Sequence, residues 1–449
     1  MENPGALALI PTLVVIVLAV LSRRALEPLV GGVIVGYVMI SQDEVMQRTM
    51  ASAQTVLADS TIVWILLAVS LFGALTHLVV HSGGAQAFSG VLIRFCRTRK
   101  SSLIATWVLG LLIFIDDYLN ALTVGTSMKG VTDEHRVSRP MLAYIVDSTA
   151  APICVLVPLS TWAVYVSGLL ETNGVAEAGA GMAAYISAIP YMIYPIVAVL
   201  LVPLVAIGLV PALGPMKTAE ARAAAGESTA TAAGGELEID FEYRGEPRLR
   251  NFLVPIVSLI FFTWWFDIDI LMGVTAALLI TFVLYGLQGT LKVGQMFDFA
   301  MEGLKGMVPA IAIIVASFML KEVNDILGLT DFVIETVSPY LTAILLPPVA
   351  FLALSLIAFA TGSFWGMYAI ALPIILPLGM ALGIDVSILV GVVVSAGAFG
   401  SHACFYGDST VLSASSSDVA TMDHALTQLP YVLIAAGVSA LAYLALGLA

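Results

Sequence analysis

Apolar residues in this chain gather into long runs that are separated by short polar segments. A hydrocarbon core about 30 Å thick needs about 20 apolar residues of helix to cross it. Runs near that length predict plain membrane spans, the second and seventh of them short, at 6–22, 28–42, 61–80, 185–210, 251–266, 270–286, 306–322 and 427–446. The pattern therefore predicts an all-α polytopic membrane protein.

Four further apolar stretches are interrupted by polar residues, glycine and proline: 102–128, 140–168, 340–382 and 387–413. Irregular backbone at membrane depth is tolerated only where protein or a water-filled cavity surrounds it. We interpret 102–128 and 340–382 as re-entrant hairpins, which enter and leave on one side, and the other two as broken helices that cross. The prediction is therefore about ten crossings plus two hairpins.

The same order of segments occurs twice. Plain spans, a hairpin, a broken helix and a last span fill 1–210, and 251–449 repeats this order from the opposite side of the membrane. Between them, 211–250 is rich in Ala, Gly, Glu and Thr without apolar periodicity, so we expect a mobile linker. Inverted repeats are typical of secondary transporters, whose binding site lies at the midplane where helices are discontinuous.

Basic residues indicate the orientation. With the N-terminus outside, all 18 lysines and arginines except Arg48 and Lys321 fall in inside loops, as the positive-inside rule expects. Ordinary crossings in place of the hairpins would put the basic cluster 129–139 outside. We therefore expect a multi-pass protein of the cell (inner) membrane with a cytoplasmic linker 211–250.

Composition excludes several classes of function. The chain is 60% hydrophobic and 11% charged, whereas soluble domains carry about 25% charged residues. Its net charge of −13 leaves no basic footprint for nucleic acid. Cys96, Cys154 and Cys404 have no paired spacing, which argues against a disulfide framework or a cysteine metal site. No HExxH or comparable catalytic motif occurs, so we expect a protein that is not an enzyme and has no cofactor.

Two adjacent acids, Asp116 and Asp117, lie in the first hairpin with Asn120 close behind. Carboxylates inside a membrane are costly and mark ion or proton paths by default. Neighbouring carboxylates resist carrying two charges, so a proton and a metal cation would compete for them, which is the simplest physical basis of cation/proton antiport. The alternative is that the acids only cap a half-helix, or pair with Lys129 or Arg136.

The first broken helix offers oxygen ligands. Pro152 and Pro158 each remove an amide donor, and the freed carbonyls suit a hard cation such as Na⁺. The polar residues that we assign here to the ion site or substrate pocket are Asp147, Ser148, Thr149, Ser160 and Thr161. The alternative is that these are proline kinks whose hydroxyls bond back to their own helix.

The second half supplies further candidates. Its hairpin turns at Gly362 and Ser363, and Trp365 either shapes a substrate pocket or packs. In the second broken helix, His402 either relays protons or holds a structural hydrogen bond. The remaining candidates there are Asp408, Ser409 and Thr410. For Na⁺ itself we predict a site at Asp117, Asp147 and Asp408.

Residues 114–125, 138–152 and 158–162 together resemble the NhaC-type sodium/proton antiporter family, and 361–366 resembles its second-half hairpin. The family belongs to a superfamily of hairpin-containing elevator carriers, and the resemblance covers about 100–430. It implies a homodimer with a fixed scaffold and a moving transport domain. The second-half motif diverges, because Ser401 stands where the family has an acid and Phe405 where it has proline.

Two functions follow as hypotheses. The first is a sodium/proton antiporter of the elevator type, whose carboxylates bind Na⁺ and H⁺ competitively within a lipid membrane. The second is a Na⁺- or H⁺-coupled transporter or exchanger of a small organic solute, a carboxylate or an amino acid. The missing acid at Ser401 and the aromatic residues Phe364, Trp365 and Phe405 favour the second. A channel is a third and weaker alternative.

Overall fold

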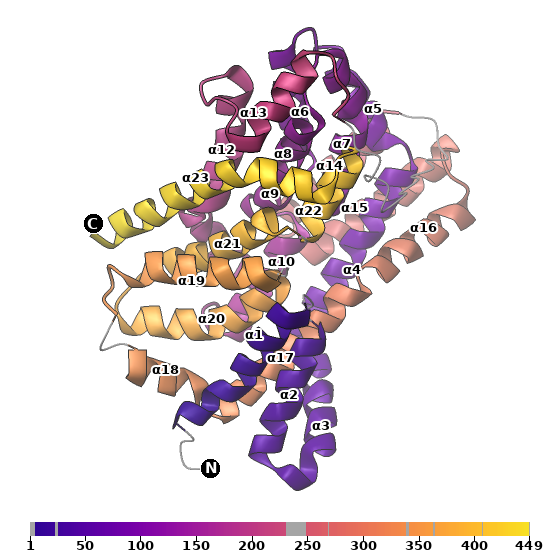
Figure 1. Cartoon of the computed structure of the whole chain (residues 1–449). Coiled ribbons are helices and arrows are strands. Elements are labelled where there is room, and N and C mark those ends of the chain that lie inside the picture. Colours follow the sequence, from indigo (N-terminus) through magenta and orange to yellow (C-terminus); the bar gives the residue numbers. More distant parts are fainter. Residues whose placement is uncertain are drawn as a thin grey trace.

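The computed structural model describes residues 5–22, 26–229, 248–267, 269–337, 341–361, 364–405 and 407–448, and these ranges contain helices and no strand. Figure 1 shows α2, α3 and α17 at one end of the molecule and α5, α6 and α13 at the other. The all-α prediction is confirmed.

The described residues of the first half form twelve α-helices, and a helical linker segment follows them. Their bounds are α1 Ile10–Ser22, α2 Leu26–Ile40, α3 Val45–Ala58, α4 Ser60–His81, α5 Gly84–Ile93, α6 Arg99–Leu112, α7 Asp117–Glu134, α8 Arg139–Thr149, α9 Ala151–Leu156, α10 Thr161–Thr172, α11 Gly181–Ala188, α12 Ile193–Ile207 and α13 Gly214–Ala224.

The second half continues with helices of similar kinds. Their bounds are α14 Arg250–Trp265, α15 Ile270–Gln288, α16 Val293–Gly306, α17 Val308–Ile326, α18 Leu329–Val337, α19 Leu346–Thr361, α20 Phe364–Ala381, α21 Val386–Ala403, α22 Asp408–Ser416 and α23 Thr421–Leu448. The predicted hairpins correspond in position to the pairs α6–α7 and α19–α20, whose members contact one another.

Within the described ranges, seven helices are long and apolar enough to cross a membrane. An eighth is added if Gly181–Tyr191 and Ile193–Ile207, bent by 54° at their junction, form one span. Four shorter apolar helices accompany them, Gly5–Leu18, Leu26–Ile40, Arg250–Trp265 and Leu346–Ala360. The chain is therefore a multi-pass membrane protein, while the count of about ten crossings stays a prediction.

Helix α13 departs from the expectation of a mobile linker. Its Met216 is fully buried, and Glu220 accepts hydrogen bonds from the backbone N–H (3.0 Å) and hydroxyl (2.6 Å) of Ser138. Glu220 also forms an ion pair with Arg99. Composition did not predict this helix, because its docking depends on contacts with α6 and α8 that are remote in sequence. Residues 230–247 of the linker lie outside the described residues.

The interrupted segments of the two halves pack together. Helix α8 contacts α22, and α9 contacts α21. Figure 1 shows α22 and α23, in yellow, crossing in front of this region, and both contact α8. The places where regular backbone hydrogen bonding stops therefore lie near one another, although they are about 250 residues apart in sequence.

Candidate functional site

Asp116 and Asp117 lie at the start of α7, where the first hairpin turns. Each is only 4% exposed. Asp116 caps the helix, because its Oδ1 accepts from the backbone N–H groups of Tyr118 (3.1 Å) and Leu119 (3.2 Å). Such a cap satisfies amides that have no partner within the helix. The capping role considered for these acids is thus real for Asp116.

Asp117 faces the first turn of α10. The indole Nε1–H of Trp162 donates to its Oδ1 at 3.3 Å. The ring of Trp162 stacks on that of Phe364, with ring centroids 3.2 Å apart. Phe364 begins α20, so the turn regions of both hairpins meet at Trp162. Trp365 packs on Tyr165 with centroids 4.7 Å apart, which agrees with the packing alternative for that residue.

The basic residues considered as partners of these acids have other contacts. Lys129 pairs with Asp418 at 2.8 Å, and Arg136 donates to the carbonyl oxygen of Ala224 at 3.3 Å. Both contacts lie at the far end of α7 from the two acids.

Asn120 joins the hairpin to the break between α8 and α9. Its Nδ2 lies 2.7 Å from the carbonyl oxygen of Gly110, 2.8 Å from that of Ile113 and 2.8 Å from that of Thr149. These carbonyls lie at or just beyond the ends of α6 and α8, where helical donors are missing. Asn120 therefore fastens two helix ends, and its Oδ1 has no partner among the described residues.

We expect Asn120→Leu to lower the free energy of unfolding by about 1–3 kcal/mol, because buried carbonyls lose their donor. The measurement is the thermal unfolding midpoint of the purified protein in detergent. Asn173→Leu is the matched control, since its Nδ2 donates to one carbonyl, that of Leu169, in a half-buried position. An Asn120 variant as stable as this control would contradict the fastening role.

Asp147 is the most completely enclosed of the candidate acids. It is 0% exposed. Its Oδ1 accepts from the hydroxyl of Ser409 on α22, and its Oδ2 accepts from Nε2 of His424 (3.1 Å) and Nε2 of Gln428 (2.9 Å) on α23. An ionised carboxylate buried without donors would be very costly. Three helices thus converge on one carboxylate.

His402 lies beside this group near the end of α21. One ring nitrogen, Nε2, is 3.1 Å from the hydroxyl of Ser148, and the other, Nδ1, is 2.9 Å from the hydroxyl of Tyr194. Its backbone carbonyl accepts from Nε2 of Gln428 at 2.7 Å. The amide of Gln428 consequently bonds both Asp147 and the end of α21, which no residue with a single N–H could do.

Sequence reasoning missed His424, Gln428 and Tyr194. The signal for the first two was present, because they are four residues apart on one face of a largely apolar helix. Starting the last span at 427 placed His424 outside the membrane, whereas α23 begins at Thr421. An ionisable side chain inside a span deserves a functional hypothesis by default. Tyr194 had no comparable signal.

Two of the other candidates, Thr149 and Ser160, have local roles in this conformation. The Thr149 hydroxyl bonds back to the carbonyl of Ile145 at 2.8 Å. Ser160 caps α10 by accepting from Ala163 N–H. Thr161 is buried, and the Thr410 hydroxyl lies 3.5 Å from the carbonyl oxygen of Ser401. Gly362, Ser363 and the side chain of Asp408 lie outside the described residues. A Na⁺ site at Asp117, Asp147 and Asp408 stays a prediction.

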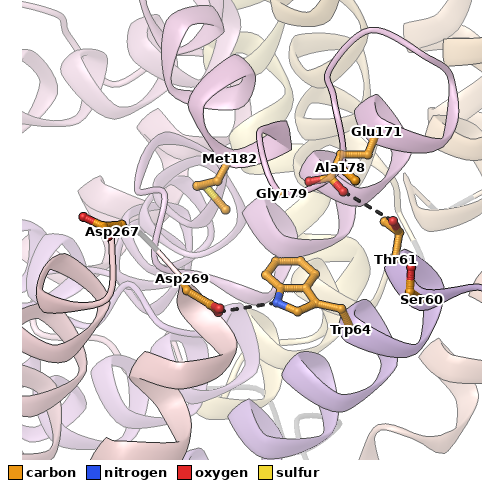
Figure 2. A pocket seen from close by; sticks show the side chains of 9 residues that line it. All are labelled: Ser60, Thr61, Trp64, Glu171, Ala178, Gly179, Met182, Asp267 and Asp269. Carbon is orange, nitrogen blue, oxygen red and sulfur yellow. Dashed lines mark hydrogen bonds between the residues drawn. The ribbon is translucent and has the colours of Figure 1, made fainter.

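A separate cavity of about 260 Å³ lies where the start of α4 meets the end of α10 and the turn before α15. Figure 2 shows the indole of Trp64 directed at Asp269, and Thr61 beside Glu171. Trp64 Nε1 donates to Asp269 (3.4 Å), and the Thr61 hydroxyl donates to Glu171 (3.4 Å). None of the candidate residues from the sequence lines this cavity.

Comparison with known families gives a match over more than half of the chain. The model of the family described as "Na+/H+ antiporter family" matches residues 153–448. A curated protein of Haemophilus influenzae, itself described as uncharacterized, is 27% identical over 479 residues. That alignment covers 98% of this chain and 90% of the relative.

Two solved transporter structures have a similar fold. The Alcanivorax borkumensis YdaH transporter superposes with a TM-score of 0.57 at 13% identity, covering 86% of this chain and 87% of its own. Neisseria gonorrhoeae MtrF, described within a class of antimetabolite efflux pumps, superposes with a TM-score of 0.50 at 13% identity, covering 90% and 85%. At this identity the likeness concerns the fold alone.

Proposed function

Because this chain belongs to the Na⁺/H⁺ antiporter family, we propose that it exchanges Na⁺ for H⁺ as a secondary transporter of the cell (inner) membrane. The linker 211–250 is then cytoplasmic, as the distribution of basic residues favours. The motifs in 114–162 support placing this chain near the NhaC-type antiporters, although its second-half motif diverges from theirs. From that placement we expect a homodimer and an elevator mechanism.

The observation that carries this proposal is the setting of Asp147. Among the described ion pairs, its partner is His424, and no lysine or arginine neutralises it. A carboxylate that is held by hydroxyl, imidazole and amide groups, without a fixed positive charge, remains able to take up a cation or a proton. Asp147 belongs to the first broken segment and its donors to the second broken segment and to α23, so movement of these elements relative to one another changes the ligands around it.

Asp117 is a second carboxylate that we assign to ion binding. It lies at the hairpin turn, and its contact with Trp162 links it to α20. Competition between Na⁺ and H⁺ at such carboxylates couples the two fluxes, because a site loaded with one ion excludes the other. The transported ions are the only small partners this scheme needs.

Reconstitution tests the proposal. Purified protein in proteoliposomes is expected to move protons when an inward Na⁺ gradient is imposed, as reported by a pH-sensitive dye inside the vesicles. Asp117→Asn, which keeps the shape of the side chain and removes its charge, should lower the initial rate about tenfold or more. K⁺ in place of Na⁺ is the ion control. Proton flux that is independent of Na⁺, or absent, would reject the proposal.

A further inference from the structure

Helix α22 carries a row of serines that begins at the candidate site. Ser409, Ser413 and Ser417 follow one another at intervals of four residues, and each such step turns by only about 40° around a helix, so the three span about 80°. We call these three residues the serine row. At its start, the Ser409 hydroxyl donates to Asp147. At its other end, Ser417 immediately follows the last helical residue.

The packing of neighbouring residues shows which way the serine row faces. Ser416 lies against α7, since a Cβ on Gly125 would fall 2.0 Å from its Oγ. Ala414 packs with Ala143 of α8. At about 100° per residue, the serine row lies between these two directions. It therefore faces the seam between α7 and α8.

The row has buried polar atoms that the fold itself does not use. Ser413 and Ser417 are both 0% exposed, and neither hydroxyl has a hydrogen-bond partner among the described residues. A buried hydroxyl without a partner is unfavourable, so alanine would be the better residue if packing alone mattered. Hydroxyls that line a seam can instead serve an ion that passes along it.

The far end of the row reaches charged residues at the surface. The side chain of Asp418 is 44% exposed and pairs with Lys129 at 2.8 Å and Arg139 at 3.5 Å. Arg139 also donates to the carbonyl oxygen of Ser417 at 3.2 Å. The serine row thus spans the distance between an enclosed carboxylate and a solvent-exposed group of charges.

We propose that the serine row is the access route by which the transported ion, a proton or a small hydrated cation, reaches Asp147 from the side of the membrane that carries Asp418. The inference rests on the proposed function, because it takes Asp147 as a group that the ion visits. The contact of Ser416 with Gly125 keeps the seam closed in this conformation, so the route opens when α22 moves away from α7.

Thiol labelling tests the route directly. Ser413→Cys and Ser417→Cys are made in a variant whose three native cysteines are replaced by serine, and a small membrane-impermeant cationic thiol reagent is added to one side of vesicles of known orientation. Both are expected to react from the Asp418 side, with position 417 faster. Ala414→Cys is the matched control, since Ala414 is equally buried but faces α8. Labelling of position 414 at the same rate, or none at 413 and 417, would overturn the route.

A second measurement leaves the native cysteines in place. The double change Ser413→Ala with Ser417→Ala should lower the rate of Na⁺-driven proton movement roughly fivefold, the size of one lost hydrogen bond, without lowering the thermal unfolding midpoint. Ser415→Ala, on the opposite side of α22, should do neither. An unchanged rate in the double variant rejects the route. A wild-type protein that moves no protons rejects the proposed function instead, and the labelling pattern still decides whether the route exists.

Discussion

Replacing Asp147 by asparagine is expected to reduce Na⁺-driven proton movement to the background of protein-free vesicles. The change removes the charge and preserves the fold, because the asparagine oxygen can accept from His424 and Gln428 while the Ser409 hydroxyl turns to accept from the new amide. An amide binds neither a proton nor Na⁺ as a carboxylate does. Dye-reported proton flux in proteoliposomes measures the loss.

Two controls make this result specific. The thermal unfolding midpoint of Asp147→Asn should match or exceed that of the wild type, because an enclosed charge has been removed. Asp325→Asn removes a surface carboxylate that pairs with Lys321, and this variant should transport at the wild-type rate. Normal antiport by Asp147→Asn would show that this carboxylate is structural and that ion exchange takes place elsewhere.

Gln428→Leu is expected to lower the free energy of unfolding by about 3–5 kcal/mol, the range for depriving a buried charge of a partner. One amide group bonds both Asp147 and the carbonyl of His402, so its loss leaves two buried acceptors short of a donor. The cost should appear as a lower unfolding midpoint in detergent and a smaller yield of folded protein.

Thr427→Val is the matched control for this change. Thr427 is the preceding residue on α23 and is also buried, but within the described part of the chain its hydroxyl bonds to carbonyls of its own helix, those of Asp423 and His424. Its removal should cost little. The cost of Gln428→Leu should also shrink in an Asp147→Asn background, because the charge that needed the donor is gone. Equal costs in both backgrounds would mean that the amide stabilises the helix end rather than the carboxylate.

The order of the helices could be predicted from the sequence, because the formation of each helix depends on residues that are close together in the chain. Apolar runs such as that of α4 must lie in lipid or in a core. The break predicted from Pro152 falls between α8 and α9, and Pro152 itself lies in the first turn of α9, where its missing amide is tolerated. The hairpin acids could be found for the same reason, since two carboxylates that directly follow a long apolar stretch can be recognised from the local sequence alone.

The partners of those acids were not accessible in this way. Asp147 contacts Ser409, His424 and Gln428, which lie 262 to 281 residues further along the chain. No local pattern states which of many buried hydroxyls or amides will meet a given carboxylate, because that depends on how the helices cross. The docking of α13 through Glu220 was hidden for the same reason.

Local chemistry therefore determines where this chain enters a membrane, where its helices break and which acids are too costly to be incidental. Tertiary packing decides what those acids touch: Asp116 caps a helix, Asp117 faces an indole, and Asp147 is held by groups from two other helices. The physical reason is range. The apolar pattern and the backbone hydrogen bonds of a helix are set by residues a few positions apart in sequence, whereas the satisfaction of a buried charge is settled only when remote helices have packed around it.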